Sequence, residues 1–205
     1  MTLARPGASR LSLGAGMLLA AGLLVTAAAV TDTQESLALL DGSGNRFDLV
    51  TTGSPEPGWA PAKTDWAQGN PSPYQIALTG DGSGYLMSPG SRLDLRIAVK
   101  NDSPRLAGEV SLEVEDPRDR GEERDPVTGN FVELFPQLIF TIRDGERVLA
   151  ERVLAPDLIT MPLAASLSPG DSRVLDVSIA LPESLDNRWQ RASTDVQFRF
   201  EGISR

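Results

Sequence analysis

The sequence predicts an all-β protein, an antiparallel β-sandwich of jelly-roll-like form that follows an apolar N-terminal segment. Three observations predict this class. Apolar and polar residues alternate in several segments, which is typical of strands with one buried face. Turn-forming residues separate those segments, with 19 Gly and 15 Pro among 205 residues. Helical signals are scarce. Phe131–Phe135 and Leu185–Arg191 indicate short helical turns, and Thr31–Leu40 could be either a helix or an extended segment.

Residues 1–29 have the organisation of an export signal. Their only charges are two arginines, and the run Leu11–Val30 is uncharged and rich in Leu, Ala and Gly. Ala27 and Ala29 supply the small residues expected at positions −3 and −1 of a cleavage site after Ala29. The alternative is a retained membrane anchor, because this run is long enough to span a bilayer. In both cases we expect the rest of the chain to be secreted or on the cell surface.

Residues 30–45 are predicted to form a flexible N-terminal segment and a candidate donor strand. The segment has no Pro, and its apolar residues lie among polar ones: Val30, Leu37, Leu39 and Leu40. An extended segment of this kind can pair with an open sheet edge of a neighbouring subunit. The alternatives are that it folds back on its own domain or remains a disordered spacer.

Residues 46–205 are expected to form the sandwich. The clearest strand is Arg92–Lys100, in which Leu93, Leu95, Ile97 and Val99 are predicted to point inward and the residues between them outward. The same alternation predicts three more strands, and two weaker ones lie nearer the N-terminus. The three are Glu109–Glu115, Val174–Leu181 and Asp195–Ile203, and the weaker two are Phe47–Thr51 and Tyr74–Thr79.

Turn signals predict how these strands are connected. Asp144-Gly145 predicts a hairpin within Leu138–Ala150, with a two-residue turn that pairs Arg143 with Glu146. A Pro-Gly pair precedes two strands, in Ser88–Ser91 and in Ser168–Asp171, and predicts type II turns with Gly at positive φ. This repetition reflects either an old duplication or convergence on one turn.

Two long stretches are predicted to be loops. Gly53–Pro73 has five prolines and contains Trp59 and Trp66. Asp116–Asn130 mixes five carboxylates with three arginines and is expected to face solvent.

The composition excludes several functions. The chain has no His and no Cys, which rules out a Ser-His-Asp triad, imidazole-ligated or thiolate-ligated zinc, and disulfides. Its net charge of −9 is opposite to the basic surface of a sequence-independent nucleic-acid binder. We therefore predict no nucleic-acid partner, no cofactor and no zinc.

Weaker candidates for chemistry remain. Asp41–Asn45, Asp81–Gly84 and the Asp116–Asp125 cluster could offer oxygens to calcium, but none has the twelve-residue calcium-loop pattern, and turns or ion-paired loops are the favoured reading. Trp59, Trp66 and Tyr74 could form a carbohydrate platform, although structural aromatics are favoured. No carboxylate pair stands out for hydrolysis, so we predict that the chain is not an enzyme.

Four features occur in an order that resembles the TasA/camelysin family of exported bacterial proteins, whose signal peptides are cut by a SipW-type signal peptidase. They are the junction Ala28–Thr33, the segment Ser88–Asn101, the Asp-Gly hairpin Leu138–Leu154, and Asn187–Gln190 before the final aromatic strand. The aromatic residue that often precedes the junction in that family is absent, since Ala29-Val30 stands there.

This resemblance implies a jelly-roll-like sandwich on the cell surface or in an extracellular, biofilm-type matrix. Some family members assemble into fibres, and one branch was described as metallopeptidases, an activity that a chain without His should not share. We therefore predict a bacterial structural or assembly subunit. The alternative is a monomeric surface module that binds a glycan or a protein.

Overall fold

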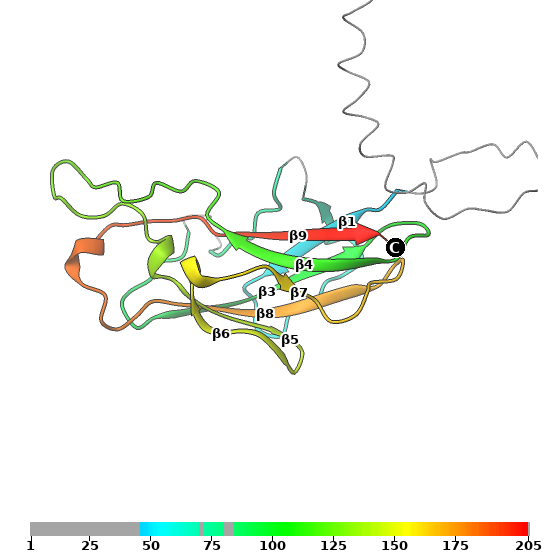
Figure 1. Ribbon diagram of the computed structural model, residues 1–205. Coiled ribbons are helices and arrows are strands. Elements are labelled where there is room, and N and C mark those ends of the chain that lie inside the picture. The colour runs from blue at the N-terminus through cyan, green and yellow to red at the C-terminus, as the bar shows by residue number, and fades with distance from the viewer. Residues whose placement is uncertain (1–45, 70–71, 80–83, 205) are drawn as a thin grey trace, which may run out of the picture. The chain divides into compact units, whose positions relative to one another are not determined.

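A computed structural model describes residues 46–204 except 70–71 and 80–83. Two antiparallel sheets face each other in this part of the chain (Figure 1). The larger sheet has the order β2-β1-β3-β8-β5-β6, and the smaller has the order β7-β4-β9. The strands are β1 Leu49–Ser54, β2 Ala67–Gln68, β3 Arg92–Asn101, β4 Gly108–Glu115, β5 Ile139–Asp144, β6 Arg147–Leu154, β7 Met161–Pro162, β8 Ser172–Ala180 and β9 Gln197–Ser204.

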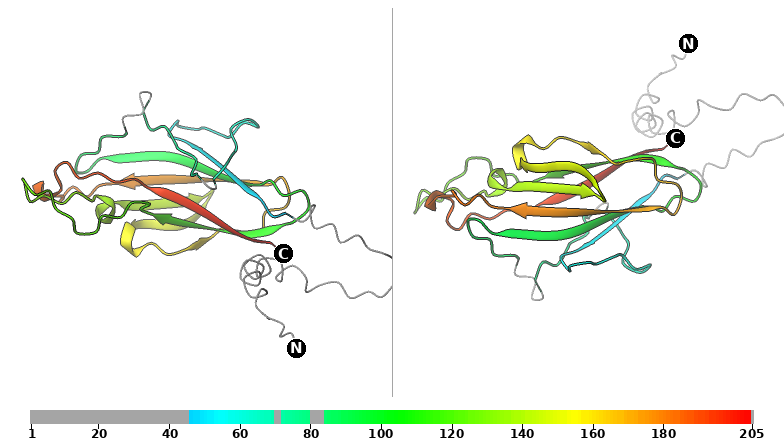
Figure 2. Two further views of the ribbon diagram at one scale, coloured as in Figure 1. Left: turned by 90° about the horizontal axis from the view of Figure 1, so that it is seen from above. Right: turned by 90° about the horizontal axis from the view of Figure 1, so that it is seen from below.

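One hydrophobic core joins the two sheets. Most of its buried residues come from β3, β5 and β8 of the larger sheet, from β4 of the smaller sheet and from the loops that follow these strands, while half-buried side chains of β9 pack against them. The largest buried side chains include Phe140, Ile97 and Leu112. The views from above and below show the sheets as two stacked layers (Figure 2). The prediction of an all-β, two-sheet protein is therefore confirmed for the described residues.

Helix is limited to short 3-10 turns in the described part of the chain. They are η2 Phe135–Gln137, η3 Ala155–Asp157 and η4 Asn187–Trp189. Two of them lie at or beside the predicted helical turns. η2 begins at Phe135, and Pro136 fits its second position because proline is tolerated in the first turn of a helix.

The strongly alternating strands form as predicted. Leu93, Leu95, Ile97 and Val99 of β3 are all buried, and Leu175, Val177 and Ile179 of β8 face the same core. β3 and β8 pair along nine residues, from Arg92↔Ala180 to Lys100↔Ser172. Alternation predicts these strands well because one face of each is packed against the other sheet.

Three predictions about strands were wrong. Tyr74–Thr79 forms no strand, although Ile76 and Leu78 still pack against the core. Ala98, predicted to point to solvent, is fully buried, because Val50 and Thr52 of β1 lie beside it on a covered outer face. Arg96 on the same face donates a hydrogen bond to the carbonyl of Trp59, so the Pro-rich loop contacts this side of the sheet.

The third error is the register of the β5–β6 hairpin. Its turn is Gly145-Glu146, so Asp144 faces Arg147, and Arg143 forms its ion pair with Glu151 at 3.0 Å instead of with Glu146. Gly145 has φ +58°, and the first central position of a type II′ turn requires such a value. Glycine therefore takes that position, and the turn lies one residue later than predicted.

The two Pro-Gly turns have the same structure. Gly90 and Gly170 have φ +81° and +86°, as type II turns require. In each turn the first residue's carbonyl accepts from the fourth residue's N–H, at 2.8 Å for Ser91 and 3.0 Å for Asp171. The side chain of the fourth residue also accepts a hydrogen bond from the N–H of the first residue, at 2.9 Å in Ser88–Ser91 and 3.0 Å in Ser168–Asp171. The predicted turn type is thus confirmed twice.

Several predictions lie outside the described residues. They are the signal peptide with Ala27 and Ala29, the segment 30–45 with Val30, Leu37, Leu39 and Leu40, and most of the Asp81–Gly84 turn. Among the described residues, no helix has the length and apolar character needed to cross a membrane.

Candidate functional site

The free edge of β9 is the first feature that could bind another molecule. β9 pairs with β4 along its whole length, from Gly108↔Ser204 to Glu115↔Gln197. In the described part of the chain, no strand pairs with its other edge. Such an edge presents unpaired N–H and C=O groups that can accept an additional strand.

The two faces of β9 differ in chemistry. Phe198 and Phe200 point inward and pack against the core, whereas Arg199, Glu201 and Ile203 point outward. Ile203 is a large apolar side chain that remains 71% exposed. An added strand would therefore have an aromatic inner face and a charged outer face beside it.

A large groove opens next to this edge, between the two sheets. Its volume is about 1920 Å³. The lining includes inward residues of β3 such as Leu95 and Ile97, Phe198 and Phe200 of β9, and the segments 73–78 and 84–89. We call this space the inter-sheet groove. Its lining is partly apolar because it includes side chains that also pack in the core, such as Leu95 and Ile97.

An aromatic stack lies at one end of the groove. Trp189, which lines the groove, stacks on Phe131 with ring centroids 4.3 Å apart. The guanidinium of Arg124 lies 3.7 Å from the centre of the Phe131 ring, a cation–π contact. These residues come from the loop before β5 and from η4, so the stack joins two loops at this end of the fold.

β6, an edge strand of the larger sheet, differs from β9 in structure. β6 contains a bulge, where the pairing with β5 shifts register near Ile142 and Arg152 takes φ +53°. The Arg152 N–H donates to the hydroxyl of Thr141 at 3.1 Å, so it does not continue the ladder. Bulges and charged side chains are common protections of edge strands. This contrast makes β9 the stronger candidate for strand addition.

Ion pairs cover the outer face of β4 and β9. Arg199 binds Glu113 and lies 3.4 Å from a carboxylate oxygen of Glu115. Hydrogen bonds from the Thr160 hydroxyl and from Arg199 hold the pKa of Glu113 below its ordinary value. This face is therefore a solvated charge ladder, and it offers no feature of a binding pocket beyond a shallow hollow beside Ile159.

The carboxylates of Asp116–Asp125, the less favoured candidates for calcium, are dispersed. Asp125 accepts hydrogen bonds from its own turn, at 2.7 Å from Thr128 N–H, and Asp119 accepts from Gly121 N–H at 2.7 Å. No group of three or more metal-ligating side chains occurs among the described residues. The three aromatic residues considered for carbohydrate binding differ in exposure, because Trp59 and Trp66 are half-buried and Tyr74 is exposed.

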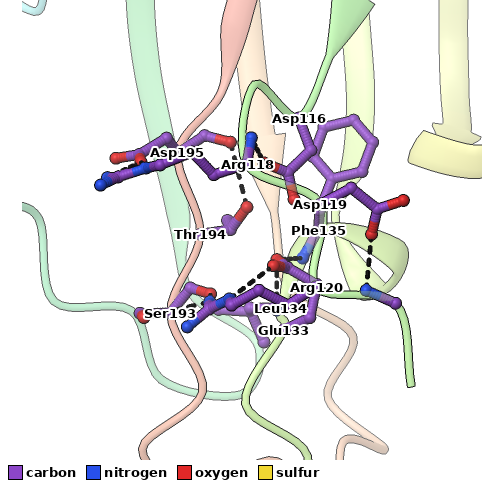
Figure 3. Close-up of polar contacts among 11 residues, drawn as sticks. Asp116, Arg118, Asp119, Arg120, Glu133, Leu134, Phe135, Ser193, Thr194 and Asp195 are labelled. Carbon is purple, nitrogen blue, oxygen red and sulfur yellow. Dashed lines mark hydrogen bonds and ion pairs between the residues drawn. The ribbon is translucent and has the colours of Figure 1, made fainter. Parts of the chain in front are cut away.

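A carboxyl pair, of which Glu133 is buried and Asp116 half-buried, is the feature that sequence reasoning missed. Glu133 is 1% exposed and lies beside Asp116, at the base of the acidic loop (Figure 3). Glu133 was detectable in principle, because it is the single acid in the apolar run Phe131–Phe135. Its pairing with Asp116 was not, because that contact depends on how the loop closes.

No protein-family model matches the chain, and no curated protein matches its sequence. The function therefore has to be inferred from the geometry of the chain's own residues.

Proposed function

We propose that this chain is an exported structural subunit that assembles on the cell surface or in the extracellular matrix by β-strand addition. The observation that carries the proposal is the free edge of β9 beside the inter-sheet groove. Backbone groups of β9 supply the hydrogen bonds for an added strand, and the groove receives its apolar side chains.

The donor in this proposal is the segment from Val30 to Leu40 of a neighbouring subunit. Cleavage after Ala29 by a signal peptidase frees its N-terminus, and Leu37 and Leu39, two residues apart, reach one face of an extended strand. A donor that enters the next subunit makes a head-to-tail contact, which propagates as a filament. The resemblance to the TasA/camelysin family, with its jelly-roll-like sandwich and matrix fibres, supports the same assignment.

A second candidate function is a monomeric surface module that binds a glycan or protein ligand. The groove favours it, because Trp189 at one end offers an aromatic wall of the kind that ligands pack against. This module would leave β9 unpaired and would remain monomeric at high concentration.

Deletion of Thr31–Leu40 separates the two functions. We expect the mature chain from Val30 to form multimers in sedimentation velocity and filaments in electron microscopy. The deletion should abolish both, because it removes the donor, while the far-ultraviolet spectrum and thermal midpoint of the domain remain unchanged.

Two double variants sharpen this test. L37D/L39D places charges on the predicted inner face of the donor and should prevent assembly. S36D/A38D adds the same charge on the opposite face of the extended segment and should leave assembly largely intact. A mature chain that stays monomeric, or a deletion variant that still forms multimers, would contradict the proposal.

A further inference from the structure

Two neighbouring carboxyl groups lie where the acidic loop meets segment 193–195, which leads into β9: Glu133 is buried, and Asp116 is half-buried with a buried Oδ2. We infer that Asp116 and Glu133 hold one proton between them and that this proton locks the loop onto that segment. The inference concerns the folded domain alone and does not depend on assembly.

Glu133 acts as the acceptor at the centre of this contact. One carboxylate oxygen accepts the N–H groups of Leu134 and Phe135, at 2.8 and 2.9 Å. The other oxygen accepts from Nε of Arg120 at 3.0 Å. Arg120 also donates to the carbonyl of Ser193, so an ionised Glu133 holds both the loop and segment 193–195.

Asp116 is arranged differently. Its Oδ1 accepts the N–H of Arg118 at 2.8 Å, but its Oδ2 is buried and has no hydrogen-bond partner among the described residues. An ionised Oδ2 would leave a buried lone charge beside the negative charge of Glu133. A protonated Asp116 carries an O–H that can donate to Glu133, so one proton satisfies both groups.

The surrounding charges do not supply a second cation for Asp116. Arg118 forms its ion pair with Asp195, and Arg120 serves Glu133 (Figure 3). Asp119 adds a further negative charge close to Asp116, and the hydroxyl of Thr194 lies beside Glu133. Full ionisation would therefore place four carboxylates against two arginines in this contact.

The pKa directions agree with this geometry. Burial raises the pKa of Asp116, and the negative charge of Glu133 raises it further. The hydrogen bond from the Arg118 N–H acts in the opposite direction but is the smaller effect. Burial also disfavours ionisation of Glu133, but hydrogen bonds from the backbone of Phe135 and from Arg120 outweigh it and lower its pKa. The pKa values of the two groups are thus shifted in opposite directions, as in other carboxyl pairs that share one proton.

The sign of the pH dependence follows. Because the native pKa of Asp116 is raised, its stabilising contribution is complete at low pH and is lost as pH rises through that native value. Because the native pKa of Glu133 is lowered, its contribution is lost as pH falls through that value. The contact is strongest in an acidic window between the two and loosens towards neutral pH.

Hydrogen exchange of the peptide that covers residues 193–197 measures this contact directly. After correction for intrinsic exchange, protection in the wild-type chain should fall by up to tenfold per pH unit above the window. D116N replaces the protonated carboxyl with a neutral amide and should keep protection nearly constant over the same range. The matched control E122Q, at an exposed carboxylate of the same loop, should retain the wild-type dependence.

Carboxyl NMR of the wild-type chain gives an independent measurement that no variant can compromise. Asp116 should titrate above the ordinary range of aspartate, and its signal should respond to the titration of Glu133. An Asp116 signal that titrates as an exposed aspartate would overturn the inference. Identical pH profiles for the wild-type chain and D116N would overturn it as well.

Discussion

Asn101 shows how one buried amide can connect separate loops. Its side chain is fully buried at the end of β3, and its Nδ2 donates to the carbonyls of Leu106 and Leu167 at 2.8 and 2.9 Å. Its Oδ1 accepts the N–H of Ser103 at 3.0 Å. All polar atoms of the side chain are therefore satisfied, which buried polar groups require.

Replacement of Asn101 tests the value of this connection. N101A removes the hydrogen bonds of the Leu106 carbonyl and the Ser103 N–H, and leaves the Leu167 carbonyl with the Gly108 N–H as its partner. We therefore expect a loss of about 2–4 kcal/mol in the free energy of unfolding. The exposed control N187A should cost less than about 0.5 kcal/mol. Urea denaturation at neutral pH measures both, and equal costs would mean that the loops do not depend on Asn101.

Sequence reasoning succeeded for the elements whose side chains alternate against a packed face. β3, β4, β8 and β9 appeared at their predicted positions because a one-residue slip would turn their apolar residues to solvent. Tyr74–Thr79 also alternates, with Ile76 and Leu78 inward, but no ladder partner lies beside it among the described residues. Alternation reports burial of one face, and it does not report a hydrogen-bonded neighbour.

The candidate site was less predictable because alternation does not report which strands are neighbours. Strand order determines that β9 lies at an edge, and strand order depends on contacts between residues far apart in the chain. The carboxyl pair depends on loop closure between Asp116 and Glu133. Only the charged turns were visible as local patterns, because the proposed donor segment lies outside the described residues.

The Pro-Gly turns give a prediction for a single element. Gly170 has φ +86°, and a methyl group added there would contact nothing in the described structure. G170A therefore tests backbone conformation alone and should destabilise the protein by about 1–2 kcal/mol. G170N should cost less, because Asn tolerates the left-handed region better than Ala. Thermal unfolding should rank the three proteins Gly, Asn, Ala, and a reversal of Asn and Ala would contradict this explanation.

The two sheets depend on each other, because neither has a second hydrophobic face of its own large enough to form a separate core. Buried residues of β3 and β4 belong to one cluster, and Phe47 lies over Gly202 of β9, where an added Cβ would come within 2.3 Å of its ring. The described domain should therefore unfold as one cooperative unit.

Core truncations on opposite sheets test this cooperativity. Ile97 of β3 is 2% exposed and Leu112 of β4 is fully buried. I97A and L112A should each lower the free energy of unfolding by about 2–5 kcal/mol, because each leaves a cavity in the shared core. Arg96, which is partly exposed and paired with Asp176 at 2.7 Å, provides the control R96A, with a cost of about 1 kcal/mol or less.

Comparison of the urea unfolding midpoints obtained with two spectroscopic probes tests whether the described domain unfolds as a single unit. Tryptophan fluorescence reports the loops that hold Trp59, Trp66 and Trp189, whereas far-ultraviolet dichroism reports the strands of both sheets. If one core joins them, each truncation shifts both transitions to the same lower urea concentration with an unchanged slope. Separation of the two transitions in L112A alone would show that the smaller sheet can unfold while the larger one remains folded. In that case the β9 edge would be lost before the rest of the domain, and strand addition at β9 would have to stabilise the smaller sheet as well as extend it.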